Sequence, residues 1–217
     1  MKIPIMEWME KLTGMLKEEF GQSLLFVGLQ GSYRRGEATQ SSDIDVVVIL
    51  EQLGLSELKR YRMLIRSMPY KEKACGFICG KEELQSWPKY DLFQLCYDTK
   101  AFYGTLDSLV PEIEQVDIAD AVRINAANLY HMACHSFLFA EDKGKCLKDL
   151  YKGAFYLLQA RCFLKTGKYG STKAELLGML EGVDREILET GIYWEELEAN
   201  IDHLYQKLLQ WCGNYIK

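Results

Sequence analysis

Two aspartates stand at a spacing that suits metal and phosphate chemistry. Asp43 and Asp45 begin a strongly apolar run, and side chains at i and i+2 of a strand share a face, so the two carboxylates point to one place. Mg²⁺ is usually held by one or two carboxylates together with substrate phosphates. The sequence therefore predicts a magnesium site at Asp43 and Asp45, of the kind that stabilises the attacking and leaving oxygens of an in-line displacement.

A glycine–serine pair before the aspartates supplies groups that suit a triphosphate. Gly31 lets the backbone approach phosphate oxygens closely, and the Ser32 hydroxyl and nearby N–H groups donate hydrogen bonds. Arg34 and Arg35 add local positive charge to a chain whose formal net charge is -5. We expect Gly31, Ser32 and Arg35 to bind the phosphates of a nucleoside triphosphate.

Two strands and the loop between them must position these residues. Residues 23–30 form a short apolar run of strand length. Residues 31–42 are rich in glycine, serine and threonine, which predicts a loop with one helical turn. Residues 43–50 become continuously aliphatic and mostly β-branched, as in a buried strand whose first turn emerges at an edge of the sheet. Both halves of the motif therefore meet at strand ends.

The rest of the first half predicts a mixed α/β domain. Apolar residues at helical spacing predict helices over residues 3–20 and 56–68. Two further strands are predicted over residues 73–80 and 91–103, joined by a short helical piece around residues 81–87. These elements give an α+β fold with a mixed sheet.

After Pro111 the pattern becomes helical throughout. The change from strand-like runs to helical periodicity indicates a domain boundary near residues 108–117. We therefore expect an α/β domain over residues 1–110 and an all-α bundle over residues 111–217. Breaks at glycine-containing segments around Gly144, Gly167, Gly182 and Gly191 separate the helices. The predicted helices span residues 117–140, 145–166, 172–180 and 194–213.

Glycine, serine and both acids together resemble the signature of the DNA-polymerase-β-like nucleotidyltransferase superfamily. That signature is a hydrophobic residue, Gly-Ser, a spacer, and an acid-hydrophobic-acid triplet at a strand start. The matching residues are Gly31, Ser32, Asp43, Ile44 and Asp45, with Arg35, Gly36 and Ser42 matching the bacterial antibiotic-modifying and minimal members. Gln30 departs from the pattern, because it is polar. Each half alone is an ordinary turn or strand end, and the combination makes the motif specific.

The resemblance implies a Mg²⁺-dependent enzyme that transfers a nucleoside monophosphate, AMP from ATP, to a hydroxyl of a small-molecule, aminoglycoside-like acceptor. A protein hydroxyl, as in minimal members of toxin–antitoxin pairs, is the alternative acceptor. Two other functions stay open: a catalytically silent nucleotide-binding or regulatory module, and a helical interaction protein with a vestigial α/β half.

The resemblance also implies a third acid from a neighbouring strand. The predicted strand over residues 73–80 holds no acid, so the direct counterpart is absent or displaced to Glu72. Asp91 and Asp98 stand at the beginning and near the end of the next predicted strand. Asp98 lies in a segment similar to the Tyr-Asp element of aminoglycoside nucleotidyltransferases and is the candidate third catalytic carboxylate, whereas Asp91 fits a strand cap. A solvated or turn-forming aspartate is the alternative for each.

The helical half resembles the accessory bundle of kanamycin-type nucleotidyltransferases and offers one more binding residue. Lys152 stands on an otherwise apolar helix face and is predicted to reach the triphosphate. A lysine that extends from a packed helix into solvent is the alternative. Asp149 and Glu141 are candidate bases toward an acceptor in a cleft between the halves.

Composition excludes several other classes of function. With 26 basic and 31 acidic residues, no bulk binding to nucleic acid or an anionic membrane is expected. No stretch reaches the roughly 20 apolar residues of a membrane span, and the first residues lack the apolar core of a signal peptide. Seven scattered cysteines fit reduced thiols and a cytoplasmic protein. An oligomer is compatible with the sequence.

Overall fold

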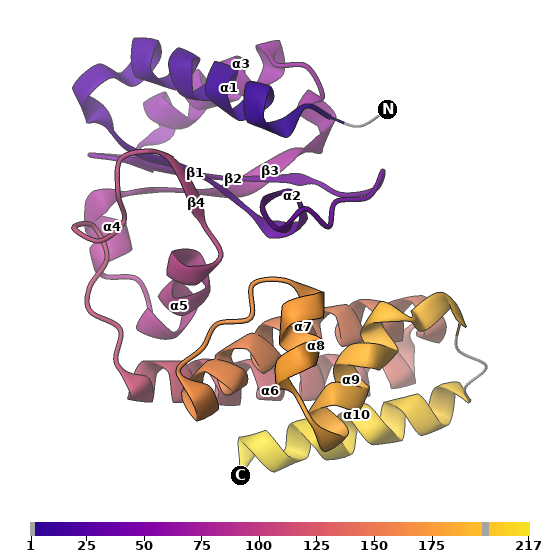
Figure 1. Ribbon diagram of the computed structural model, residues 1–217. Coiled ribbons are helices and arrows are strands. Elements are labelled where there is room, and N and C mark those ends of the chain that lie inside the picture. Colours follow the sequence, from indigo (N-terminus) through magenta and orange to yellow (C-terminus); the bar gives the residue numbers. More distant parts are fainter. Residues whose placement is uncertain (1–2, 197–199) are drawn as a thin grey trace. The chain divides into compact units, whose positions relative to one another are not determined.

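The computed structural model describes residues 3–196 and 200–217. The chain divides into two compact units, Met1–Glu112 and Ile113–Lys217. The first is a sheet with helices and the second is entirely helical, as the sequence predicts for the fold class (Figure 1). The division into separate domains over residues 1–110 and 111–217 stays a prediction.

A mixed four-stranded sheet forms the centre of the first unit, with the strands in the order β3-β2-β1-β4. Strands β1 (Leu24–Gln30) and β2 (Ile44–Leu50) pair antiparallel, and β3 (Ala74–Gly80) runs parallel to β2. Strand β4 (Lys100–Tyr103) pairs antiparallel with β1 at the opposite edge. The strands predicted around the glycine–serine and aspartate motifs are therefore neighbours at the centre of the sheet.

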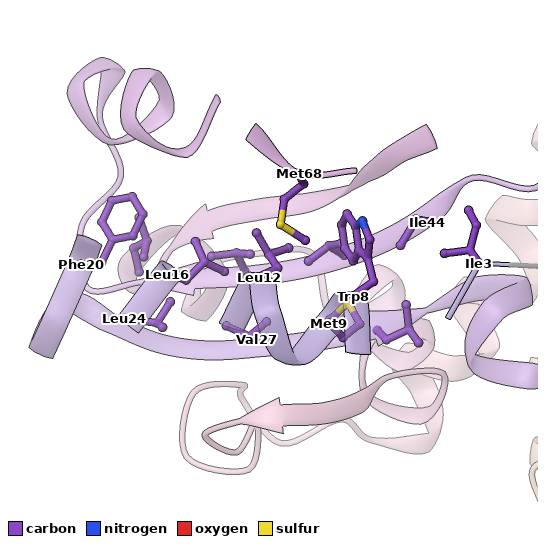
Figure 2. Close-up of a cluster of buried hydrophobic side chains, with 14 residues drawn as sticks. Ile3, Trp8, Met9, Leu12, Leu16, Phe20, Leu24, Val27, Ile44 and Met68 are labelled. Atoms are coloured by element: carbon purple, nitrogen blue, oxygen red, sulfur yellow. The ribbon is translucent and has the colours of Figure 1, made fainter. Parts of the chain in front are cut away.

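Helices α1 (Ile5–Phe20) and α3 (Leu55–Ser67) cover one face of this sheet (Figure 1), which confirms the two predicted helices. Apolar residues of α1 at helical spacing pack against alternate residues of the strands. Figure 2 shows the resulting cluster, which includes Trp8, Met9, Leu12, Leu16, Phe20, Leu24, Val27, Ile44 and Met68. The Trp8 indole also donates to the Pro69 carbonyl at 2.7 Å, which joins α1 to the turn after α3. This packing fixes the two motif-bearing strands from one side.

The other face of the sheet carries short helices, and here one prediction is wrong. The strand predicted over residues 91–103 is helix α5 (Lys89–Tyr97) followed by the short strand β4. The segment has no β-branched residue before Thr99, Asp91 lies in the first turn of the helix, and Leu92, Phe93 and Leu95 are buried. The predicted helical piece around residues 81–87 is helix α4 (Lys81–Gln85).

The second unit is a bundle of helices. Its α-helices are α6 (Gln115–Phe139), α7 (Lys143–Thr166), α8 (Lys173–Met179), α9 (Gly182–Ile192) and α10 (Ile201–Ile216). Helices α6 and α7 pack along each other, and α9 and α10 complete the core around them (Figure 1). The helices predicted over residues 117–140, 145–166 and 172–180 correspond to α6, α7 and α8.

The breaks predicted around Gly182 and Gly191 are confirmed, because α8 ends at Met179 and α9 begins at Gly182 and ends at Ile192. The segment between these breaks, to which the sequence assigns no helix, is helix α9. A Cβ on Gly191 would lie 2.9 Å from the Tyr151 carbonyl oxygen, so this glycine permits close packing of α9 on α7. The helix predicted over residues 194–213 begins at Ile201, because the Asn200 side chain caps it; residues 197–199 of that range lie outside the described residues.

A half-buried carboxylate joins three helices of the bundle. Asp184 of α9 accepts hydrogen bonds from Trp211 Nε1 at 2.8 Å and Tyr215 Oη at 2.6 Å, both in α10. Its other oxygen accepts from Arg161 Nε of α7 at 2.7 Å. Burial acts to raise the pKa of Asp184, but these three hydrogen bonds outweigh it and the pKa lies below its ordinary value. The network therefore stabilises the charged form.

In the part of the chain that the structure describes, no helix has both the length and the apolar character that crossing a lipid bilayer requires.

Candidate active site

The pairing of β1 and β2 brings the glycine–serine turn to the first aspartates of β2. Gln30, the last residue of β1, stands opposite Asp45. Gly31 follows with φ of 69°, a conformation that disfavours any residue with a Cβ. A Cβ there would overlap the Asp45 Oδ2 atom, so the carboxylate lies directly against the glycine backbone. The two halves of the motif thus form one site.

Helix α2 (Gly31–Arg35) contains the residues predicted to bind phosphate. It is the helical turn expected in the loop, and Gly36 ends it in the left-handed conformation with φ of 73°. Ser32 is half-buried at its start, while Arg34 and Arg35 form its last turn. Gly31, Ser32 and Arg35 are therefore brought together beside Asp45.

Asp43 and Asp45 stand on either side of the first residue of β2. Asp43 is exposed and Asp45 is half-buried. Burial raises the pKa of Asp45, the negative charge of Asp43 raises it further, Arg35 lowers it, and Asp98 raises it. Charge repulsion between neighbouring carboxylates is what a bound cation relieves, so this donor pair fits Mg²⁺ completed by substrate phosphates. Within residues 3–196 and 200–217, no three histidine, cysteine or acidic side chains are grouped to hold a metal ion by themselves.

Asp98 lies behind α2, in contact with both of its arginines. It directly follows α5 and is 2% exposed. Its Oδ2 is 2.5 Å from Arg35 Nη1, and its Oδ1 is 3.7 Å from Arg34 Nη1. Burial raises the pKa of Asp98 despite the two guanidinium groups that lower it. Asp98 is therefore joined to the predicted phosphate-binding helix α2 through its two arginines.

Arg35 is enclosed by two carboxylates. Besides Asp98, it contacts Glu37, whose Oε2 lies 3.2 Å from Arg35 Nε. The Arg35 side chain is 6% exposed, whereas the Arg34 side chain is 21% exposed. The arginine predicted to bind phosphate is thus neutralised within the protein, and Arg34 presents more of its guanidinium to solvent.

Among the described residues, no hydrogen bond or ion pair joins the other candidates for a third acid to Asp43 or Asp45. Glu72 is exposed in a 3₁₀ turn before β3. Asp91 accepts from the Trp87 indole at 3.3 Å in the first turn of α5. The β3 residue in register with Asp45 is Cys75, which is exposed. A thiol thus occupies the β3 position that pairs with Asp45 of the predicted metal-binding pair.

Lys73 is a site residue that no pattern in the sequence indicates. Its Nζ donates to the carbonyl oxygens of Gln40 at 2.5 Å and Ser42 at 3.2 Å, and so fixes the loop that leads into Asp43. Within this loop the Thr39 N–H donates to the Ser42 hydroxyl at 2.9 Å. The loop also borders a cavity of about 640 Å³, lined by Tyr33 of α2 among others. Only the fold brings Lys73 to these carbonyls.

Lys152 belongs to the second unit. It is exposed on α7, where its Nζ lies 3.5 Å from Asp149 Oδ1 of the preceding turn. Asp149 is one of the two candidate bases toward an acceptor. Binding of triphosphate by Lys152 stays a prediction.

Comparison with known proteins places this geometry in context. Residues 9–116 match the family model described as a nucleotidyltransferase domain. A relative from Methanocaldococcus jannaschii, named as a protein adenylyltransferase, is 40% identical over 48 residues, which are 22% of this chain. The match spans 33% of the length of that relative.

Among solved structures, the chain is similar to spectinomycin adenyltransferase AAD(9) from Enterococcus faecialis, determined with ATP and spectinomycin. The TM-score is 0.54 and the sequence identity 16%, and the alignment covers 94% of this chain and 98% of that one. The likeness shows a shared fold over almost the whole chain, including both units.

Proposed function

Because this chain belongs to the DNA-polymerase-β-like nucleotidyltransferases, we propose that it transfers AMP from ATP to a hydroxyl group of a small, aminoglycoside-like acceptor. One observation carries the proposal: the Asp45 carboxylate lies against Gly31, which places a carboxylate pair beside a turn suited to phosphate.

In the proposed reaction, the acceptor hydroxyl oxygen attacks the α-phosphorus of ATP while its proton passes to a base or to water, and the bond from phosphorus to the bridging oxygen breaks, releasing pyrophosphate. Asp43 and Asp45 would hold Mg²⁺, which when bound supplies the positive charge that stabilises the attacking and leaving oxygens. The backbone of Gly31 and the hydroxyl of Ser32 orient the phosphates. Arg34 places positive charge beside them, and phosphate binding by Arg35, whose charge Asp98 and Glu37 balance, stays a prediction.

The relatives support the choice of nucleotide and acceptor. The structural neighbour was solved with ATP and spectinomycin, and the partial relative is named as an adenylyltransferase. Because that relative is named as acting on protein, a protein hydroxyl is the second candidate acceptor. We further propose that residues 111–217 are the accessory domain and that the enzyme works in the cytoplasm.

A silent nucleotide-binding module is the competing function, and one observation favours it. The position in register with Asp45 on β3 holds a cysteine, so that strand contributes no acid beside the pair. A site with two carboxylates would bind nucleotide and transfer it slowly or not at all.

Transfer from ATP labelled at the α-phosphate separates these functions. The acceptors are spectinomycin, a panel of aminoglycosides, and a protein extract, each with Mg²⁺. We expect labelled product with the wild type and none with Asp43→Asn or Asp45→Asn. Glu51→Gln, an exposed carboxylate just past the other end of β2, is the matched control and keeps wild-type activity. Binding of ATP without any labelled product would favour the silent module.

A further inference from the structure

We propose that Asp98 is a positioning residue that holds helix α2 in its phosphate-binding conformation, and that it is not a third metal ligand. The inference rests on the proposed function, because it assigns α2 to the binding of ATP. It also replaces the catalytic role that the sequence resemblance implied for Asp98.

A single carboxylate pairs with both arginines in the last turn of α2. Asp98 accepts from Nη1 of Arg35 at 2.5 Å, and its second oxygen is 3.7 Å from Nη1 of Arg34. A helix of five residues has almost no internal hydrogen bonds to maintain it, so contacts with other elements decide whether it forms. Asp98 supplies such contacts in the last turn, and the Gly31 N–H at the first residue also acts to lower the pKa of this carboxyl.

The pairing of β1 with β4 explains how Asp98 comes to this position. Leu29 stands opposite Lys100, so Gly31, two residues after Leu29, and Asp98, two residues before Lys100, lie beyond the same end of these antiparallel strands. The position of Asp98 beside α2 therefore follows from the fold rather than from a flexible surface contact.

The surroundings of Asp98 suit an arginine and oppose a divalent cation. Both of its oxygens face guanidinium groups, and the Asp98 side chain is 3% exposed. Oδ1 is buried without a hydrogen bond, and Arg34 is the cationic group paired with it. A metal ion at either oxygen would lie beside positive charge, which raises its energy in a poorly solvated site. Asp43 and Asp45 have no ion pair of this kind among the described residues.

Three measurements on purified full-length protein test the assignment. The variants are Asp98→Asn, Arg35→Gln, the double variant, and Asp45→Asn for comparison. Amide hydrogen exchange follows residues 30–37, calorimetry gives the affinity for a non-hydrolysable ATP analogue at saturating Mg²⁺, and electron paramagnetic resonance gives the affinity for Mn²⁺ without nucleotide. Asp91→Asn is the matched control, because Asp91 lies in α5, the helix that Asp98 directly follows, and contacts Trp87 instead of α2.

We expect Asp98→Asn to speed exchange in residues 30–37 and to weaken the ATP analogue about tenfold, the loss of one charge-assisted hydrogen bond. Its Mn²⁺ affinity stays at the wild-type value, whereas Asp45→Asn loses Mn²⁺ affinity. The effects of Asp98→Asn and Arg35→Gln are less than additive, because both break the same contact. A loss of Mn²⁺ affinity in Asp98→Asn as large as in Asp45→Asn would overturn the assignment.

The exchange measurement separates this proposal from the proposed function. If the wild type neither binds the ATP analogue nor transfers AMP, the proposed function fails, while faster exchange in ligand-free Asp98→Asn still supports the positioning role. Unchanged exchange in residues 30–37 overturns that role whatever the result with nucleotide. Asp98→Ala repeats the exchange measurement with a side chain that, unlike asparagine, cannot accept a hydrogen bond from Arg35.

Discussion

The Asp45 Oδ2 atom occupies the space that a Cβ on Gly31 would need. The contact joins the end of β1 to the start of β2 and leaves no room for any other residue type at position 31. Its consequence can be tested by adding a single methyl group.

Gly31→Ala is expected to reduce AMP transfer by about 100-fold, equivalent to about 2.7 kcal/mol, because the new Cβ displaces the Asp45 carboxylate. The backbone strain at positive φ also costs about 1 kcal/mol of stability. Gly36→Ala is the matched control: its φ is 73°, but no atom lies within 4 Å of a Cβ built there. Initial rates and thermal unfolding of both variants separate the effect of backbone strain from that of the steric clash with Asp45. Equal losses of activity in the two variants would contradict the prediction.

Lys73→Met is expected to raise the KM for ATP severalfold. The variant removes the ammonium group that hydrogen bonds to the Gln40 and Ser42 carbonyls, so the loop before Asp43 loses its fixed conformation. Stability falls by about 1 kcal/mol, the usual net value of such bonds. Steady-state kinetics and urea unfolding check both effects. Lys71→Met, an exposed change in the same turn, serves as the control, and an identical KM in the two variants would count against the loop assignment.

Asp184→Asn is expected to destabilise the helical unit by about 2–3 kcal/mol at neutral pH, because three donors lose a charged acceptor. The pKa of Asp184 lies below its ordinary value, so its contribution is complete above the unfolded pKa of about 4. It is lost as pH falls through the lower folded pKa. Urea unfolding at several pH values tests this, with Asp202→Asn as the control. A variant whose stability falls with acid as steeply as the wild type would refute the prediction.

Gly191→Ala is expected to destabilise the same unit by about 1–3 kcal/mol, because its Cβ would meet the Tyr151 carbonyl at 2.9 Å and push α9 from α7. Gly178→Ala, in helix α8, has no atom within 4 Å of the added Cβ. It should leave stability unchanged or raise it by up to about 1 kcal/mol. Thermal unfolding distinguishes the two, and a stable Gly191→Ala protein would show that α9 relaxes without loss.

Strong local patterns were sufficient to predict much of the first unit. The apolar runs that became β1, β2 and β3 have few alternatives to a strand, and α1 shows a clear helical period. Residues 91–97 are predicted as a strand and form a helix, because a short run with leucines and a phenylalanine fits a buried strand and a buried helix equally well. Helix α9 has no counterpart in the prediction because it lies between two glycine-containing breaks, and the packing of Gly191 against the Tyr151 carbonyl is not visible in local sequence.

The proximity of Gly31 to Asp45 followed from motif spacing, whereas the partners of the arginines did not. Arg35 and Asp98 are 63 residues apart, and their contact depends on the register between β1 and β4. Lys73 is 33 residues from Gln40 and 31 from Ser42, and its partners there are backbone carbonyls, which every residue type carries. Such contacts become visible only when the sheet is assembled.

The edge strand β4 has a consequence for biosynthesis. The glycine–serine turn and the aspartates are synthesised early, but Asp98, which pairs with both arginines of α2, follows Arg35 by 63 residues. Pairing of β4 with β1 is a long-range event, and such contacts form late in folding. A nascent chain that ends before Asp98 is therefore expected to have the nucleotide motif without its finished shape, so ATP could act as a stabilising ligand only after β4 has joined the sheet.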